Sequence, residues 1–159
     1  MTVARPQNSS PAVFDRVGAI RVTAPRGAAD LLAEEAAALG AAGAQAVGNG
    51  VELTGTLADC MRLNLHLRTA NRVLFRIDSF AADGPEALYR AVRTIPWEDY
   101  LPVATPFSVH GFIRHPTIRD TRFAGLRVKD AVADRFTERF GRRPDSGPGL
   151  GRFVIFLHW

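Results

Sequence analysis

The sequence has almost none of the chemistry that cross-links extracellular proteins or anchors proteins in membranes. Cys60 is the only cysteine in 159 residues, which excludes an internal disulfide and fits a reducing compartment, so we expect a cytoplasmic protein. No apolar run approaches the ~20 residues that a helix needs to cross a bilayer, and no membrane partner is expected. Residues 1–16 lack the apolar segment of a signal peptide and are predicted to form a disordered tail.

Catalytic and cofactor motifs are also missing. No phosphate-binding G-x-x-x-x-G-K-[ST] loop, dinucleotide-binding G-x-G-x-x-G turn or G-x-S-x-G nucleophile motif occurs. The glycine-rich residues 147–151 lead into a predicted strand rather than a helix, which argues against a phosphate cradle. The histidines are scattered without zinc-like spacing. We therefore expect no catalytic residue, no metal site and no cofactor site in this chain; the four histidines are His66, His110, His115 and His158.

Lysine is nearly absent, and the positive charge is concentrated in one half of the chain. Nineteen of the 20 basic residues are arginines, and the net charge is +4. Residues 1–83 hold eight basic and eight acidic side chains, whereas residues 84–159 hold twelve basic and eight acidic ones. The whole excess therefore lies in the second half, which indicates a surface that could bind phosphate.

The first half predicts a ferredoxin-like module over residues 17–82, with strands and helices in the order β-α-β-β-α-β. The Asn49-Gly50 dipeptide predicts a hairpin, because a type I′ turn needs positive φ at both central positions. Cys60 is expected to be a buried small apolar residue. The expected elements are a strand over 17–24, a helix over 28–39, short strands over 44–47 and 51–54, a helix over 57–70 and a strand over 72–80.

The second half predicts a separate α/β unit over residues 83–159. Asp83 is placed to cap a helix that has Pro85 in its first turn and buries Leu88 and Val92. A Pro-interrupted aromatic turn follows over residues 95–101. Strands are expected over 107–113 and 152–159, separated by a helix over 117–141 and a Pro/Gly-rich loop.

The helix over 117–141 is the most informative stretch. Thr117 with Asp120 is a capping-box-like start, and Gly141 is a natural end. Apolar side chains repeat at the spacing of a buried helix face: Val128, Ala131, Val132, Phe136 and Phe140. A second group of charged side chains is expected on the far side of the helix: Asp130, Asp134 and Glu138.

Cations beside the buried face of this helix suit a polyanion. Arg122 and Lys129 come within roughly 20° of each other on a helical wheel. Arg143 and its neighbour sit in a loop, where pairing with the helix C-terminus is an equally good explanation, and any exposed arginine can simply be solvated. The candidate ligand-binding residues are Arg114, Arg119, Arg122, Lys129, Arg142 and Arg143, with His115 as a further candidate.

Three aromatic residues have two interpretations each. Trp97 and Tyr100 could stack on bases, but an aromatic turn after a helix more often fills a core, and we favour that. Phe123 falls near the solvent side of the helical wheel. It either packs on the preceding loop, which we favour, or contacts a partner.

Three segments resemble one known family. They are APRGAADLLAEEAAALGA with VGNGVELTG, the turn Trp97–Leu101, and Arg119–Phe136 with its Thr121-x-Phe123 and Val128-Lys129-Asp130. Over roughly Gly18 to Trp159 the sequence resembles the N-terminal region of the bacterial large-subunit rRNA guanine-N2 methyltransferases. That region is a ferredoxin-like module followed by a THUMP domain, here over 83–159, although the THUMP region could begin near residue 57.

This resemblance implies that the chain binds RNA, most directly rRNA. It also implies that a downstream Rossmann-type domain, in cis or in trans, performs methylation with S-adenosylmethionine. The Asn/Asp-Pro-Pro motif of that domain is missing here. The alternative is a protein-interaction α+β module that docks on a partner domain through its last, strongly apolar strand. A free-standing enzyme has little support.

Overall fold

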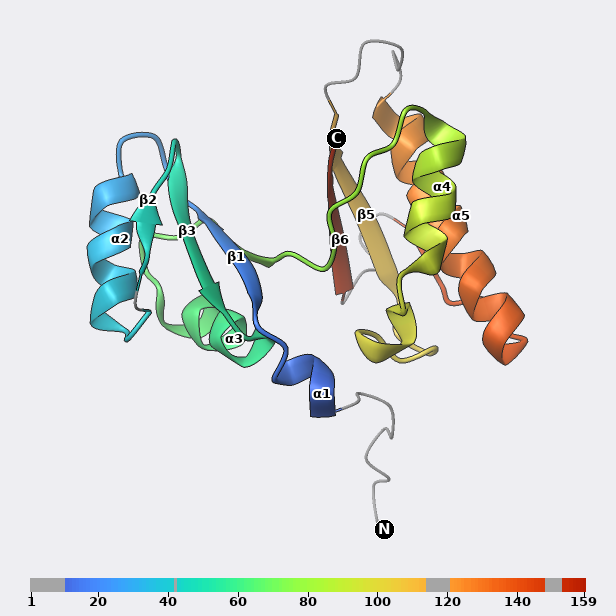
Figure 1. Ribbon diagram of the computed structural model, residues 1–159, viewed down its shortest axis with the longest axis horizontal. Helices are drawn as coiled ribbons and strands as arrows, with labels where there is room; N and C mark the ends of the chain where they lie inside the picture. Colours follow the sequence, from blue (N-terminus) through green and yellow to red (C-terminus); the bar gives the residue numbers. More distant parts are fainter. Residues whose placement is uncertain (1–10, 42, 114–120, 148–152) are drawn as a thin grey trace. The chain divides into compact units, whose positions relative to one another are not determined.

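The computed structural model describes residues 11–41, 43–113, 121–147 and 153–159. The chain divides into two compact units, Ser10–Ser79 and Phe80–Trp159 (Figure 1). Each unit contains both helices and strands, which confirms the predicted α+β class. None of the helices in the described part of the chain has the length and apolar character required to span a membrane.

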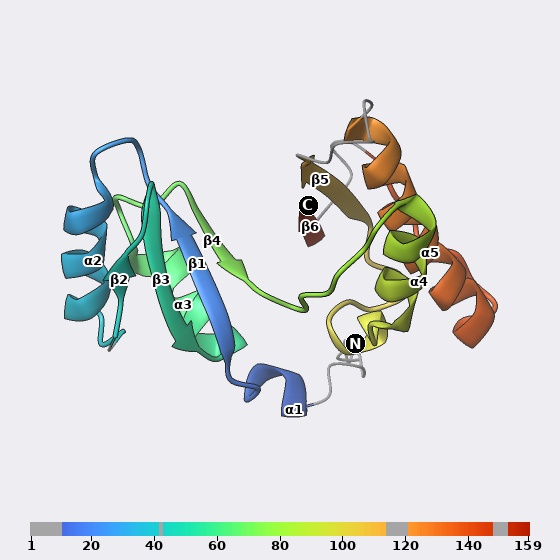
Figure 2. The ribbon, with the colours of Figure 1, turned by 45° about the horizontal axis from the view of Figure 1, so that its top comes forward.

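The first unit has the predicted β-α-β-β-α-β order. Its antiparallel sheet has the strand order β2-β3-β1-β4, and the two helices cover one face of it (Figure 2). This is the ferredoxin-like arrangement, in which the first and third strands are central. The elements are β1 (Gly18–Thr23), α2 (Ala29–Ala38), β2 (Gln45–Ala46), β3 (Gly50–Gly55), α3 (Leu57–His66) and β4 (Arg72–Phe75).

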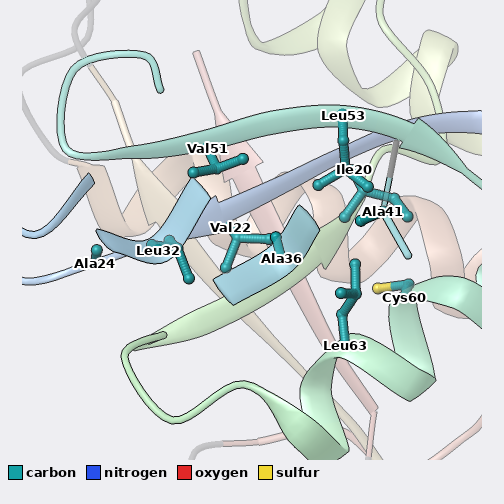
Figure 3. Packing of buried hydrophobic residues seen from close by; sticks show 10 residues of the cluster. All are labelled: Ile20, Val22, Ala24, Leu32, Ala36, Ala41, Val51, Leu53, Cys60 and Leu63. Carbon is teal, nitrogen blue, oxygen red and sulfur yellow. The ribbon is translucent and has the colours of Figure 1, made fainter. Parts of the chain in front are cut away.

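The core of this unit lies between the sheet and its two helices. Figure 3 shows β1 and β3 contributing alternate side chains, which meet apolar residues of α2 and α3. Because side chains alternate across a strand, the same strands turn polar residues such as Arg21 to the other face. Six members of the cluster are completely buried: Ile20, Val22, Leu32, Ala36, Val51 and Leu63.

Two local predictions in this unit need correction. The hairpin forms, but its turn is centred one residue earlier, on Gly48-Asn49, and the Val47 N–H donates to the Gly50 carbonyl over 2.8 Å. Gly48 has a φ of 56°, and no non-glycine residue in the described chain has positive φ. A type II′ turn needs positive φ only at its first central position. Gly48 takes that position, and Asn49 at the second one keeps a negative φ. The predicted tail also shortens, because Pro11–Phe14 form a helical turn, α1, with Val13 buried.

Helix α3 and strand β4 are shorter than predicted. Thr56 and Asp59 form a capping box that fixes the start of α3. The helix ends at His66 rather than near residue 70, because the Glu35 carboxylate of α2 accepts hydrogen bonds from the backbone N–H groups of Arg68 and Thr69 at 3.0 and 3.1 Å. Those two N–H groups are therefore not available to continue the helix.

The second unit is built around a parallel strand pair and two packed helices. Its elements are α4 (Pro85–Thr94), the 3₁₀ turn η1 (Trp97–Asp99), β5 (Phe107–Phe112), α5 (Thr121–Phe140) and β6 (Phe153–His158). Strands β5 and β6 pair in parallel with Phe107 opposite Phe153. Parallel neighbours need a long crossover connection, and α5 provides it. Helix α5 packs against both α4 and β5.

The ends and the buried face of these helices match the predictions in part. Gly84, not Asp83, is the N-cap of α4, because Pro85 occupies the first helical position and the cap is the residue directly before it. Gly141 ends α5 with a φ of 64°. Thr117 and Asp120, the predicted start, lie outside the described residues. Phe140 is 39% exposed rather than buried, whereas the other four predicted apolar residues are buried: Val128, Ala131, Val132 and Phe136.

The Glu35 carboxylate yields the first prediction. The Thr69 hydroxyl and the Arg68 and Thr69 N–H groups hold the pKa of Glu35 at about 2, compared with an ordinary value of 4.5. Because this pKa is depressed on folding, the carboxylate contributes stability above about pH 4.5 and loses it as the pH falls towards 2. We expect Glu35→Gln to destabilise the first unit at pH 7, with the difference from the parent shrinking below pH 4.5.

Hydrogen exchange over residues 57–75 is the suitable measurement, because it reports local opening of this unit. Glu34→Gln is the matched control, since Glu34 is an exposed neighbour on the same helix. Equal exchange in Glu35→Gln and Glu34→Gln at pH 7 would show that the carboxylate does not hold the loop after α3.

Candidate nucleic-acid interface

Among the described residues of the positively charged half, five of the eight arginines pair with acids of the same unit. Helices α4 and α5 are joined by the pairs Arg93–Glu138 at 2.7 Å and Arg127–Glu86 at 2.6 Å. Arg139 contacts Glu98 at 2.8 Å. These cations are used inside the protein. The surplus positive charge that a ligand could meet must therefore come from other residues.

Glu98 is the centre of this charge network. Its side chain is only 10% exposed and accepts two hydrogen bonds from Arg135, at 2.8 Å from Nε and 2.7 Å from Nη2. Arg135 also donates through Nη1 to the carbonyls of Arg93 and Thr94 at the end of α4. The hydrogen bond from Arg135 lowers the pKa of Glu98, and the same contact raises the pKa of Arg135. One guanidinium thus connects α5, η1 and the C-terminus of α4.

The acidic residues of α5 do not all face solvent, which corrects the sequence interpretation. The Asp134 carboxylate accepts a hydrogen bond from the Tyr89 hydroxyl of α4 at 2.7 Å, and this contact raises the pKa of Tyr89. The Arg127 guanidinium lies 4.4 Å from the centre of the Tyr89 ring. Asp134 and Glu138 therefore lie on the side of α5 that faces α4. The helical wheel showed the angle between them but could not show where the second helix would pack.

The predicted ligand-binding residues now fall into three groups. Arg114 and Arg119, like His115, lie outside the described residues. Arg143 contacts Asp130 at 3.5 Å and Asp134 at 3.8 Å, so its charge is partly compensated. The remaining three are Arg122 and Arg142, which are exposed, and Lys129, which is half-buried.

Two of these candidates have no acidic partner. Within the described ranges, Lys129 and Arg142 make no ion pair, and the Arg142 residue is exposed. Arg122 is exposed and lies about two helical turns before Lys129 on α5. Phe123 and Leu126, 47% and 49% exposed, lie on the same half of the helix. The N-terminal half of α5 therefore presents Arg122 together with apolar surface, whereas Arg142 follows the other end of the helix.

The aromatic turn is part of the core, as predicted. Trp97 is 2% exposed, and its Nε1–H donates to the Val92 carbonyl at 2.8 Å. This indole is not available to stack on a base. Tyr100 is half-buried. Phe123 remains exposed, and the loop on which it was expected to pack lies outside the described residues.

Sequence reasoning missed an aromatic face on the β5–β6 pair. His110 stacks with Phe156 at a centroid distance of 5.7 Å, and Phe112 stacks with His158 at 5.5 Å. Phe112 is 54% and Phe156 is 43% exposed. Each strand alone reads as apolar with isolated histidines. The pairs become visible only when the parallel register is known, and nothing local in the sequence specifies that register.

Neither a metal site nor a reactive thiol emerges from the described part of the chain. No group of three or more His, Cys, Asp or Glu side chains there could hold a metal ion. Cys60 is buried in the first core, and burial raises its pKa to about 11. A thiol with such a pKa is protonated and unreactive at neutral pH, because the thiolate is the nucleophile. Its role is packing, as predicted.

Comparison with known families assigns both units. Residues 19–74 match the RlmL ferredoxin-like domain, and residues 84–146 match the THUMP domain. Together these models cover most of the chain. The protein thus belongs to the class in which a ferredoxin-like module precedes a THUMP domain. More narrowly, it belongs to the family of the large-subunit rRNA methyltransferases, as the relatives below indicate.

Its curated relatives carry the name Ribosomal RNA large subunit methyltransferase K/L. The relative from Syntrophotalea carbinolica is 45% identical over 122 residues, which are 77% of this chain and 17% of that protein. The relative from Allochromatium vinosum is 37% identical over 136 residues, 86% of this chain and 18% of that protein. The chain thus spans less than a fifth of the length of these relatives.

Solved structures show the same fold. A predicted N6-adenine-specific DNA methylase from Listeria monocytogenes str. 4b F2365 matches with a TM-score of 0.72 and 27% identity, over 94% of this chain and 39% of that one. The SMU.472 structure, which is complexed with SAH, matches with a TM-score of 0.75 and 23% identity, over 90% of this chain and 38% of that one. At that identity the second match supports the fold alone.

The Glu98 network yields the second prediction. Glu98→Gln leaves Arg135 with a neutral partner in a site where both side chains are largely buried, so we expect a loss of about 2–3 kcal/mol in the free energy of unfolding. Glu138→Gln removes the exposed Arg93 pair and should change stability little. Urea unfolding followed by tryptophan fluorescence measures this, because Trp97 and Trp159 both lie in the second unit.

The pH dependence gives an internal check on the same variant. Since folding lowers the pKa of Glu98, the parent should lose stability as the pH falls below the ordinary range of a glutamate. Glu98→Gln should lack that part of the loss. If Glu98→Gln and Glu138→Gln were equally stable, Glu98 would not be the centre of the network.

Proposed function

We propose that this chain binds RNA and is the RNA-recognition region of an S-adenosylmethionine-dependent rRNA guanine-N2 methyltransferase. The observation that carries the proposal is the THUMP match over residues 84–146 together with relatives named as rRNA methyltransferases. The expected ligand is rRNA, and the expected location is the cytoplasm. The chain itself performs no chemistry in this scheme, and it positions RNA for a catalytic domain.

The surface cations support this function in a particular way. The salt bridges of α4 and α5 use four arginines of these helices internally, so the unpaired positive charge is concentrated on few residues. Lys129 and Arg142 have no acidic partner in the described chain, and Arg122 is exposed on the same helix as Lys129. Isolated cations of this kind can bind the phosphate groups of a nucleic-acid backbone, because such contacts do not depend on the base sequence. Arg114, Arg119 and Arg143 remain further candidates for the same contact.

The cofactor would be bound elsewhere in the larger protein. S-adenosylmethionine supplies the methyl group when it is bound, and methyl transfer yields the SAH that is found with SMU.472. In the described part of the chain, no glycine-rich turn joins a strand to a helix N-terminus, which is the local geometry that holds such nucleosides in Rossmann-type folds. We therefore assign the cofactor to a downstream Rossmann-type domain, supplied in cis or in trans.

The third prediction concerns the salt dependence of RNA binding. The triple variant Arg122→Ala, Lys129→Ala, Arg142→Ala should bind a hairpin RNA at least about tenfold more weakly at low salt. The slope of log affinity against log salt should become less negative by about 2–3, because each lost phosphate contact removes about one unit. Electrophoretic mobility shifts across a salt series measure both quantities.

A charge-matched control separates a local site from bulk charge. Arg26→Ala, Arg76→Ala, Arg90→Ala removes three exposed arginines that belong to other elements than α5 and have no ion pair in the described structure. We expect it to retain most of the affinity. Equal losses in the two triple variants would place the binding in the net charge, and no RNA binding by the parent chain would refute the proposed function.

A further inference from the structure

Arg143 makes the longest ion pairs among the described arginines of the second unit. Its guanidinium lies 3.5 Å from the Asp130 carboxylate through Nη2 and 3.8 Å from the Asp134 carboxylate through Nη1. The other paired arginines of this unit contact their acids at 2.6–2.8 Å. The first of the Arg143 distances is at the limit of a hydrogen bond, and the second is beyond it. Arg143 is therefore held near these carboxylates without being fixed by them.

The exposure of this contact separates it from the pairs that hold the helices together. The side chain of Arg143 is 53% exposed, and those of Asp130 and Asp134 are 40% and 43% exposed. Glu98, in contrast, is 10% exposed, so loss of Arg135 would leave a buried carboxylate without its main partner. Exposed ion pairs contribute little to stability, because water screens both charges. Arg143 is thus the paired arginine that a ligand can take from its acids at the lowest free-energy cost.

The position of Arg143 places it beside a cation that is already a candidate for RNA contact. It directly follows Arg142, which is exposed and has no ion pair in the described ranges. Gly141 ends α5 with a φ of 64°, and Arg143 beyond it reaches back to Asp130 and Asp134, about three and two turns before that end. Consecutive Cα atoms are only about 3.8 Å apart, and an arginine side chain is longer than that. A ligand held by Arg142 is therefore within reach of Arg143.

We propose that Arg143 becomes a second RNA contact beside Arg142 and that Asp130 limits its strength by competing with the RNA phosphate. This inference rests on the proposed RNA-binding function and names a residue that sets the strength of that binding. The ligand is the phosphate backbone of RNA. In the free chain the Arg143 guanidinium is shared between two carboxylates, and in the complex it exchanges them for a phosphate. Asp130 itself does not touch the RNA.

Asp130 decides this balance more than Asp134 does. The Asp134 carboxylate already accepts a hydrogen bond from the Tyr89 hydroxyl at 2.7 Å, and its contact with Arg143 is the longer of the two. Asp130 contacts Arg143 alone among the described cations. Like charges four residues apart on a helix repel each other, so relief of the repulsion between Asp130 and Asp134 is the structural alternative for Arg143. The two roles predict different responses to loss of Asp130.

A competing carboxylate makes binding selective for a ligand with closely spaced phosphates. The ligand must offer Arg143 a better acceptor than Asp130, and it must bring its own negative charge close to that carboxylate. Phosphate can accept two parallel hydrogen bonds from one guanidinium, whereas the Asp130 carboxylate is within hydrogen-bond distance of one nitrogen. Successive phosphates of RNA can serve Arg142 and Arg143 together. A built-in repulsive group of this kind rejects weaker ligands.

The fourth prediction is that Asp130→Asn increases the affinity for RNA. In the full chain of 159 residues we expect a hairpin RNA to bind about three- to fivefold more tightly, because Arg143 no longer has to leave its carboxylate. Arg143→Ala should weaken binding about twofold in the parent and about eightfold in the Asp130→Asn variant. Asp130→Asn should therefore add little in the Arg143→Ala background. Electrophoretic mobility shifts of the four proteins form a double-mutant cycle that isolates this coupling.

Two controls separate this coupling from net charge and from folding. Glu34→Gln also removes one exposed carboxylate, but from α2 of the first unit, and should change the RNA affinity less than twofold. Urea unfolding of Asp130→Asn and Arg143→Ala should match the parent closely, because exposed pairs contribute little to stability. If the contact only ordered the loop that carries Arg142 and Arg143, Asp130→Asn would weaken RNA binding instead of strengthening it.

The outcomes distinguish this inference from the proposed function. If the parent binds RNA and Asp130→Asn binds it equally or more weakly, Asp130 does not compete for Arg143, and the inference is wrong while RNA binding stands. An equal gain from Asp130→Asn with and without Arg143, or an equal gain from Glu34→Gln, would assign the effect to general charge and would also overturn it. If neither the parent nor Asp130→Asn binds RNA, the proposed function is refuted together with this inference.

Discussion

The second unit depends on the ion pair between Arg135 and Glu98. This contact joins Arg135 of α5 to Glu98 of η1. Arg135 also donates to carbonyls at the end of α4, so that three elements are held together. A helix leaves its last carbonyls without intrahelical partners. Here the Arg135 guanidinium of α5 donates hydrogen bonds to two such carbonyls of α4. The η1 turn is also held by burial of Trp97, by the hydrogen bond of its indole to the Val92 carbonyl and by the contact between Arg139 and Glu98.

This network changes how the positive charge of the chain should be interpreted. Twelve basic residues in the second half suggest a broad basic surface, but several of them hold α4, α5 and η1 together. Exposed ion pairs of this kind contribute little stability each, yet they still neutralise the arginines that form them. Phosphate binding then depends on a small number of residues. Counting arginines overestimates the surface, and only the pairing of each one identifies the cations that remain.

The features that the sequence predicted correctly are those encoded locally. The order of elements in the first unit follows from alternation, helical periodicity and turn residues. The errors arose where distant residues decide. Glu35 of α2 ends α3 early by binding the N–H groups of Arg68 and Thr69, and those residues are more than thirty positions away. The Arg122 and Lys129 candidates were found by periodicity, whereas the side of α5 that faces α4 was not.

The open face of β5 and β6 follows from the topology of the second unit. Two parallel strands require a crossover, and one long helix supplies it here, so one face is covered by the connection itself. A single crossover cannot cover both faces. The residues on the other face must then tolerate water or meet a ligand, and a run such as Phe153–His158 with three phenyl, imidazole or branched side chains facing outward is costly to leave in water. The helix that carries Lys129 thus covers one side of the sheet, and the exposed Phe112 and Phe156 lie on the strands it leaves partly uncovered.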